Sequence, residues 1–193
     1  MAVSQHAGKV IVLNGTSSAG KTSLALELQR VAPELQPIHV QLDAFRAMEP
    51  AGYWSIEYKE QGLLRLEALC RAINSAVAQF ARFGQNVILD HVLTPEACRF
   101  LLEDLAGHDV LLVKVECSHE QLRLREAGRG DRESGLAESQ LESVHTACSY
   151  DFEVNTTSSP PTELARRVAV WLRANSSPAA INRMHSAHAA KDA

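Results

Sequence analysis

Short apolar runs alternate along the chain with longer stretches in which apolar residues recur every three or four positions. The runs are rich in Val, Ile and Leu, and such runs are typical of strands buried on both faces of a parallel sheet. The strands are expected at residues 10–13, 38–42, 87–89, 110–115 and 152–154, and the helices at 22–31, 56–83, 95–105, 120–127, 137–148 and 161–172. The pattern therefore predicts one α/β domain with a doubly wound, five-stranded parallel sheet.

The ends of this domain are also visible in the sequence. The last predicted helix begins with Pro at its first turn and closes a domain that spans residues 1–174. Ser, Ala, His and Pro dominate residues 175–193 with little periodicity, which predicts a disordered tail.

Composition narrows the classes of protein that the chain can represent. Of 193 residues, 46% are apolar and 22% charged, and the net charge of −4 provides no overall attraction to nucleic acid or to an anionic membrane. No signal peptide or membrane-spanning run is apparent, so a cytoplasmic protein is expected. The oligomeric state is left open.

The four cysteines, at positions 70, 98, 117 and 148, do not have the spacing of a zinc site or of a Cys-x-x-Cys redox pair. We therefore expect neither a structural metal nor a disulfide in a reducing compartment.

A phosphate-binding loop follows the first predicted strand and opens the first predicted helix. It has the spacing Gly-x₄-Gly-Lys-Thr and consists of Gly15, Thr16, Ser17, Ser18, Ala19, Gly20, Lys21 and Thr22. Backbone N–H groups at such a helix N-terminus bind phosphates, Lys21 is expected at the β/γ-phosphates, and Thr22 is expected on Mg²⁺. The alternative is a glycine-bearing turn before an ordinary helix. The loop predicts binding of ATP with Mg²⁺.

Two aspartates follow predicted strands, at the edge of an open α/β sheet where ligands bind. Asp90 ends an apolar strand and is expected to hold Mg²⁺ through water. Asp43 follows the second strand, which we expect to neighbour the strand before the phosphate loop, and it is then available to an acceptor hydroxyl as general base or positioning group. The alternative for each is an aspartate that caps a helix or lies in a turn.

Four arginines gather at residues 123–132, beside glycines at 128 and 130. Guanidinium groups stabilise charge in phosphoryl transfer, so we interpret residues 123–136 as a lid that brings Arg125, Arg129 and Arg132 to the nucleotide. Arg123 is expected on a solvated helix end. A nucleic-acid patch is disfavoured because no aromatic residues lie between the arginines.

These residues together resemble the chloramphenicol phosphotransferase-like family, whose members open with I-L-N-G-G-S-S-A-G-K-S. The resemblance rests on Val12–Thr22, on Arg125-Glu126 with Arg129-Gly130-Asp131-Arg132, on Gly135, Ala137 and Gln140, and on Val144-His145, Tyr150-Asp151, Val154 and Thr156-Thr157. It implies a P-loop fold of the nucleoside or shikimate kinase type. It also implies ATP-dependent phosphorylation of a small-molecule hydroxyl, typically of chloramphenicol, with Asp43 as base.

The sequence departs from the family pattern where the acceptor should lie. His91 stands where the family has a second aspartate. The segment between Ala44 and Gly62 also differs from the family, and it contains Tyr53, Trp54 and Tyr58. These aromatic side chains either stack on the acceptor or pack against the start of a helix. Asp43-Ala44-Phe45-Arg46 also resembles the D-x-F-R segment of zeta-toxin-type kinases, which act on nucleotide sugars. A third possibility is a P-loop protein that binds nucleotide without transferring phosphate.

Overall fold

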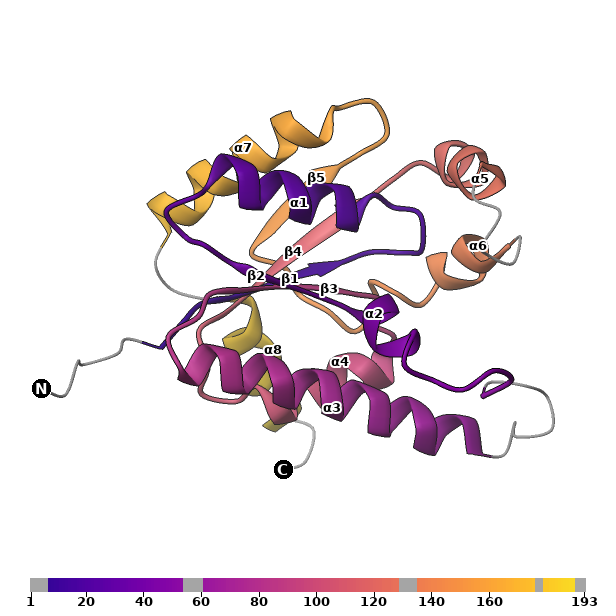
Figure 1. The fold of residues 1–193 in the computed structure, drawn as a ribbon, viewed down its shortest axis with the longest axis horizontal. Coiled ribbons are helices and arrows are strands. Elements are labelled where there is room, and N and C mark those ends of the chain that lie inside the picture. The colour runs from indigo at the N-terminus through magenta and orange to yellow at the C-terminus, as the bar shows by residue number, and fades with distance from the viewer. Residues whose placement is uncertain (1–6, 54–60, 129–134, 176–178, 190–193) are drawn as a thin grey trace, which may run out of the picture.

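The computed structural model describes residues 7–53, 61–128, 135–175 and 179–189 (Figure 1). The strands are β1 (Val10–Asn14), β2 (Ile38–Gln41), β3 (Val87–His91), β4 (Val110–Glu116) and β5 (Phe152–Asn155). The helices are α1 (Lys21–Val31), α2 (Leu42–Arg46), α3 (Gly62–Arg82), α4 (Pro95–Asp104), α5 (His119–Ala127), α6 (Leu136–Leu141), α7 (Pro161–Ala174) and α8 (Ala180–Ala189). The strands form one sheet in the order β2-β3-β1-β4-β5, and every pairing is parallel. The predicted fold class is confirmed.

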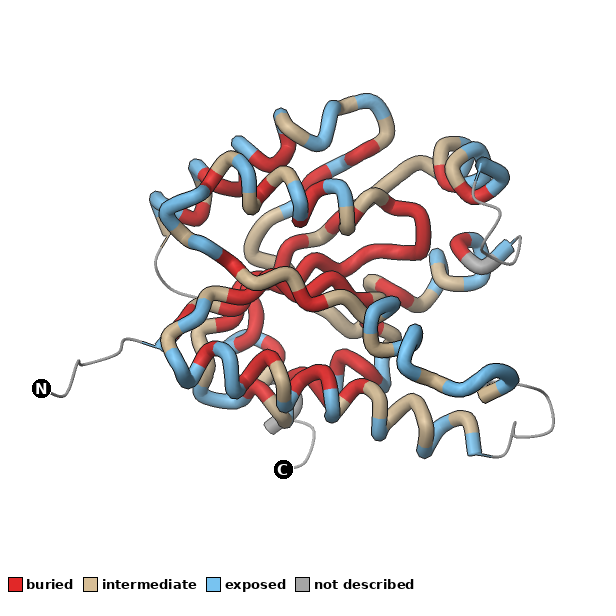
Figure 2. The backbone as a smooth tube through the Cα atoms, viewed as in Figure 1, coloured by how far each residue is buried: buried red, intermediate tan, exposed pale blue. Residues whose placement is uncertain are grey.

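The sheet separates two layers of helices, α1 and α7 on one face and α3, α4 and α8 on the other (Figure 1). Successive side chains of a strand point to opposite faces, and β1 supplies both layers. Val10 and Val12 join the apolar cluster beneath α3 and α4, whereas Ile11 and Leu13 join the cluster beneath α1 and α7. This is why the run is apolar throughout, and why the strands form the buried centre of the domain (Figure 2).

The strand order corrects one expectation. β2 pairs with β3, with Val40 opposite Leu89, so β3 lies between Asp43 and the P-loop strand. Asp43 itself lies in the first turn of α2, whose N-cap is Gln41, so the alternative of Asp43 as an N-cap is wrong as well. The order of strands within a parallel sheet depends on which crossover covers which face, and the pattern along one strand does not contain that information.

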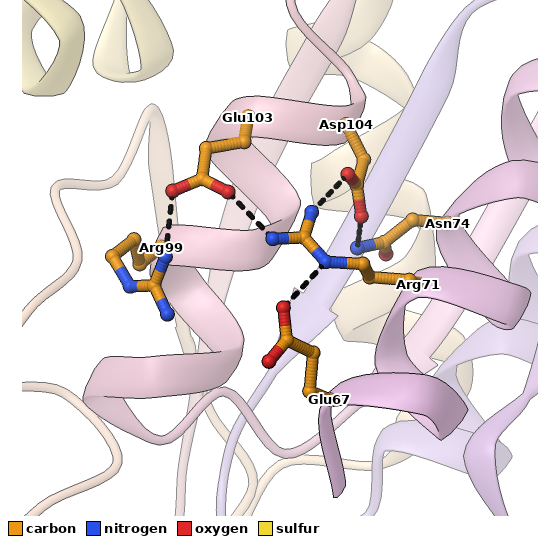
Figure 3. Close-up of polar contacts among 6 residues, drawn as sticks. All are labelled: Glu67, Arg71, Asn74, Arg99, Glu103 and Asp104. Atoms are coloured by element: carbon orange, nitrogen blue, oxygen red, sulfur yellow. Dashed lines mark hydrogen bonds and ion pairs between the residues drawn. The ribbon is translucent and has the colours of Figure 1, made fainter. Parts of the chain in front are cut away.

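A network of charged side chains holds α3 against α4 (Figure 3). Arg71 of α3 donates to Glu67 in its own helix at 2.8 Å and to Glu103 and Asp104 at the end of α4, at 2.8 and 2.5 Å. The buried amide of Asn74 donates to the second oxygen of Asp104 at 3.0 Å. One guanidinium thus bridges three carboxylates and fixes the register of the two helices.

The tail that we predicted to be disordered over 175–193 contains a helix in the part that the structure describes. Residues 180–189 form α8, and Ala180, Ile181 and Met184 are buried against the layer of α3 and α4. Asp151 accepts hydrogen bonds from the N–H groups of residues 179 and 180, at 2.9 and 2.8 Å, and so satisfies the start of the helix. The apolar residues at positions 180, 181 and 184 have helical spacing, but they are too few to stand out in a Ser- and Ala-rich segment.

Other boundaries differ by a few residues. The helix predicted over 137–148 ends at Leu141 and continues as turns, and the part of the helix predicted over 56–83 that precedes residue 61 lies outside the described residues. In the parts of the chain that the structure describes, none of the helices is both long and apolar enough to cross a bilayer.

Candidate active site

The phosphate-binding loop runs from the end of β1 to the start of α1, at the carboxyl edge of the sheet. Glycine is required at both ends of it. A Cβ at Gly15 would lie 2.3 Å from the carbonyl oxygen of Val115, and Gly20, the N-cap of α1, has a φ of 91°. Ser18 also has positive φ, at 61°, which curls the loop into the form in which successive N–H groups converge on an anion.

The carbonyl groups of the loop are held away from that anion site. Thr156, directly after β5, donates its hydroxyl to the oxygen of Ala19 at 2.7 Å, and Arg125 of α5 approaches the oxygen of Ser18 at 3.4 Å. The Ser18 hydroxyl is buried, and within the described residues it has no hydrogen-bond partner. A phosphate oxygen would satisfy it, so the loop fits the group that the sequence predicts.

The lysine, the threonine and one aspartate of the prediction meet below the loop. Lys21 Nζ donates to the oxygen of Thr16 at 2.8 Å and lies 3.8 Å from Asp90, while the Thr22 hydroxyl donates to Asp90 at 2.6 Å. Burial alone would raise the pKa of Asp90, but His39, Lys21 and Thr22 together lower that pKa below its ordinary value. Asp90 is therefore an ionised carboxylate joined to the threonine that is expected on Mg²⁺.

Asp43 lines the same small cavity, of about 40 Å³, although its strand is not the one next to β1. The other lining residues are Ser18, Gly20, Lys21, Thr22, Ser23, Gln41, Leu42, Asp90, His91 and Val92. Both predicted acids thus line one cavity together with the P-loop lysine. Within the described residues there is no cluster of three His, Cys, Asp or Glu side chains able to hold a metal. A Mg²⁺ ion would be held by the Thr22 hydroxyl and by phosphate oxygens, with Asp90 acting through water.

A second cavity, of about 380 Å³, lies on the other side of the loop. It is lined by Ser18, Gly20, Ser23, Leu24, Arg125, Gly128, Thr156, Ser159, Pro161 and Leu164. Arg125 donates to the hydroxyl and the carbonyl of Thr156 at 3.0 and 2.6 Å, which fixes its guanidinium at the cavity wall. The structure thus brings Arg125 to the phosphate loop, as the lid interpretation expects, whereas Arg123 is exposed. Arg129 and Arg132 lie outside the described residues.

Two side chains that sequence reasoning did not single out fasten the described parts of the lid segment. The buried carboxylate of Glu126 accepts from the N–H groups of Gly135 and Ala137, at 2.8 and 3.0 Å, and thereby joins the end of α5 to the start of α6. Gln140 of α6 accepts from the N–H of Ser17 at 2.7 Å. Glu126 and Gln140 both belong to the stretch that resembles the family around the lid segment, and this resemblance was the one sign in the sequence that they have a role.

Asn14, the last residue of β1, is a third such residue. Its amide nitrogen donates to the Val144 carbonyl at 2.8 Å and to the Tyr150 hydroxyl at 2.7 Å, and its oxygen accepts from the N–H of Leu93 at 2.8 Å. The ring nitrogen Nδ1 of His145 lies within hydrogen-bond distance of the Tyr150 hydroxyl, at 2.7 Å. One buried amide thus ties the base of the phosphate loop to the segments after β3 and before β5.

The departures from the family pattern have distinct structural outcomes. His91 is fully buried, and burial lowers its pKa to about 4, so it is neutral near pH 7 and does not replace the charge of an aspartate. The Arg65 guanidinium stacks on the Tyr53 ring at 4.2 Å and donates to the Tyr53 carbonyl, which supports the packing interpretation for that residue. Trp54 and Tyr58 lie outside the described residues.

The sheet order and the phosphate loop between β1 and α1 define a protein of the P-loop fold. A sugar kinase from Janibacter sp. HTCC2649 superposes with a TM-score of 0.65 at 20% identity, covering 86% of this chain and 95% of that one. APS kinase of Mycobacterium tuberculosis superposes with a TM-score of 0.63 at 17% identity, covering 86% of this chain and 98% of that one. Shikimate kinase of Acinetobacter baumannii superposes with a TM-score of 0.61 at 14% identity, covering 89% of this chain and 96% of that one. At these identities the likeness concerns the fold alone.

Sequence comparison gives the family. Residues 8–173 match the chloramphenicol phosphotransferase-like protein family, and the chain belongs to it. In an alignment of 202 residues the chain is 35% identical to a candidate O-phosphotransferase of Mycobacterium tuberculosis, with 92% of this chain and 88% of that protein covered. The family predicted from the sequence is confirmed.

Proposed function

We propose that the protein is an ATP-dependent O-phosphotransferase that phosphorylates a hydroxyl of a small molecule, and that the acceptor is an antibiotic such as chloramphenicol. The observation that carries the proposal is the cavity that Asp43 lines together with Lys21 and Thr22. A protein that only binds nucleotide does not need a second carboxylate there. Membership of the family supports the reaction class more strongly than the acceptor.

Each group in the cavity has a place in an in-line transfer. The acceptor oxygen forms a bond to the γ-phosphorus, the bond from that phosphorus to the β–γ bridging oxygen breaks, and ADP leaves. Asp43 takes the hydroxyl proton as the new bond forms. Lys21 stabilises the charge on the β- and γ-phosphates, and Thr22 with Asp90 would hold Mg²⁺, which supplies further neutralisation of that charge.

The second cavity would take the nucleoside part of ATP, beside Arg125 and the loop after β5. Arg129 and Arg132 belong to the proposal as donors that stabilise the transferring phosphoryl group. If they do, alanine at both should lower turnover more than it weakens ATP binding, whereas two solvated surface residues would leave turnover at the wild-type rate. A kinase that consumes ATP also fits the cytoplasmic location that we propose.

One screen tests the proposal. ATP consumption and the mass of the acceptor are measured with chloramphenicol, with other hydroxyl-bearing antibiotics and sugars, with UDP-N-acetylglucosamine, and with no acceptor. An antibiotic that gains one phosphoryl group with stoichiometric ADP supports the proposal. If the nucleotide sugar alone is phosphorylated, the protein is a zeta-toxin-type kinase. If ATP is hydrolysed at a rate that no acceptor increases, phosphoryl transfer to an acceptor is contradicted altogether.

A further inference from the structure

Two cysteines that lie 50 residues apart in the sequence meet behind the phosphate loop. Cys98 lies in the first half of α4, and Cys148 lies in the turn before β5. Their sulfur atoms are 3.0 Å apart, although the chain spacing gave no sign of a pair. A disulfide requires a separation of about 2.05 Å, so closure needs a movement of only about 1 Å.

The two thiols differ in their exposure to solvent. Cys98 is buried, whereas Cys148 is half-buried, and both line a cavity of about 530 Å³ between α4, residues 146–149 and α8. Arg99 and Arg183 line the same cavity together with Glu96, so two positive charges and one negative charge border it. A small oxidant can therefore reach Cys148 first.

We propose that Cys98 and Cys148 are an oxidation site at which a hydroperoxide converts two thiols into a disulfide. The Cys148 thiolate attacks one peroxide oxygen, the O–O bond breaks, and water or an alcohol leaves with the proton. The Cys148 sulfenic acid that results is attacked by Cys98 sulfur, the S–O bond breaks, and a second water leaves. Two thiols and one hydroperoxide thus give one disulfide, one water and one molecule of alcohol or water.

The surroundings decide which sulfur attacks. The Asn14 amide nitrogen lies 3.7 Å from the sulfur of Cys148 and can donate to a thiolate at that position, and the sulfur atoms of Cys148 and Cys98 are in hydrogen-bond contact at 3.0 Å. The contact between the two sulfur atoms lowers the pKa of Cys148, while the same contact and burial raise the pKa of Cys98. Cys98 Sγ meets the Ala147 carbonyl at 3.5 Å, an acceptor that favours its protonated form. Cys148 is therefore the attacking thiol and Cys98 the resolving thiol.

Closure would reach the phosphate loop through Asn14. Shortening the sulfur contact draws Cys148 toward α4 and away from the Asn14 amide, which also holds Val144 and Tyr150. Since Asn14 precedes Gly15, oxidation should lower kinase turnover, and this part of the inference rests on the proposed function. Disulfide formation itself does not depend on any activity.

The test begins with the full chain and hydrogen peroxide. Wild-type protein should fall from four free thiols to two and lose the mass of two hydrogens. Digestion under non-reducing conditions should yield a peptide that joins Cys98 to Cys148, and dithiothreitol should restore all four thiols. Four free thiols after treatment, or a sulfinic acid at Cys148 without the joined peptide, would overturn the proposal.

Single variants separate the two roles and guard against misfolding. After mild oxidation Cys148→Ser should form no sulfenic acid at position 98, whereas Cys98→Ser should accumulate a sulfenic acid at position 148 that a dimedone probe traps. Cys117→Ser serves as the matched control and should form the disulfide as wild type does. A sulfenic acid at position 98 in Cys148→Ser would contradict the assignment of the attacking thiol. Turnover is then compared before and after oxidation. A loss that dithiothreitol reverses in wild type, and that does not occur in Cys98→Ser, ties the disulfide to the kinase.

Discussion

Arg125 and Thr156 form a hydrogen-bonded pair at the wall of the cavity beside the phosphate loop. The guanidinium donates to the threonine hydroxyl at 3.0 Å and to its carbonyl at 2.6 Å, and the hydroxyl donates to the carbonyl of Ala19 at 2.7 Å. Helix α5, the loop after β5 and the phosphate loop are therefore one connected unit. Arg125 orients the loop, in addition to any contact with the nucleotide.

Arg125→Ala should weaken ATP binding by about tenfold or more, because hydrogen bonds from a charged donor contribute about 1.5–3 kcal/mol each. The measurement is calorimetric titration with a non-hydrolysable ATP analogue. Arg123→Ala is the matched control, since this exposed arginine lies on the same helix. Equal affinity of the two variants would show that Arg125 has no part in the site.

Lys21→Ala should abolish most ATP affinity or turnover while the fold persists. The lysine side chain is buried below the loop, and its ammonium group already lies beside Asp90 at 3.8 Å. Circular dichroism establishes folding, and coupled ADP release measures turnover. Wild-type binding and turnover in a folded variant would remove the phosphate loop from the reaction.

Much of this arrangement could be predicted from the sequence, because local patterns carry it. The run before Gly15 is apolar on both faces, and the spacing from Gly15 to Thr22 places lysine and hydroxyl at a helix N-terminus. The order of the strands could not be predicted, since it depends on packing between distant segments. Asn14 and Gln140 could not be assigned roles either, because the partners that define those roles, Val144 for Asn14 and Ser17 for Gln140, lie more than 100 residues away in the chain.

The docking of α8 depends on Asp151, which accepts two N–H groups at its start and the N–H of Leu112 at 2.9 Å. Asp151→Ala should lower the free energy of unfolding by about 1–3 kcal/mol, measured by urea denaturation. Glu153→Ala, an exposed change two residues away, is the control and should be close to neutral. Unprotected amides over residues 180–189 of wild type in hydrogen exchange would contradict the docked helix.

Arg71→Met should destabilise the contact between α3 and α4, because it removes the guanidinium that bridges three carboxylates in the network of Figure 3. The hydrogen bond from Arg71 lowers the pKa of Glu103 below its ordinary 4.5. A carboxylate whose pKa is lower in the folded protein than in the unfolded one stabilises the fold at any pH above its unfolded-state pKa. This stabilisation is lost as the pH falls through its folded-state pKa. The difference in thermal midpoint between wild type and Arg71→Met should therefore be largest near pH 7 and shrink below pH 4.5. Arg82→Met, at the exposed end of α3, is the control, and a difference independent of pH would contradict the ion-pair account.

Asp43 distinguishes a phosphotransferase from a nucleotide-binding protein. It lies in the first turn of α2 and lines the cavity with Lys21, so Asn at this position keeps the shape and removes the proton acceptor. Mg-ATP affinity and acceptor phosphorylation are measured on wild type and on Asp43→Asn, with the acceptor found in the screen. The account predicts nearly unchanged ATP affinity and a fall in phosphoryl transfer of about 10²–10⁴-fold. Full transfer activity in Asp43→Asn would contradict it and return Asp43 to a structural role in α2.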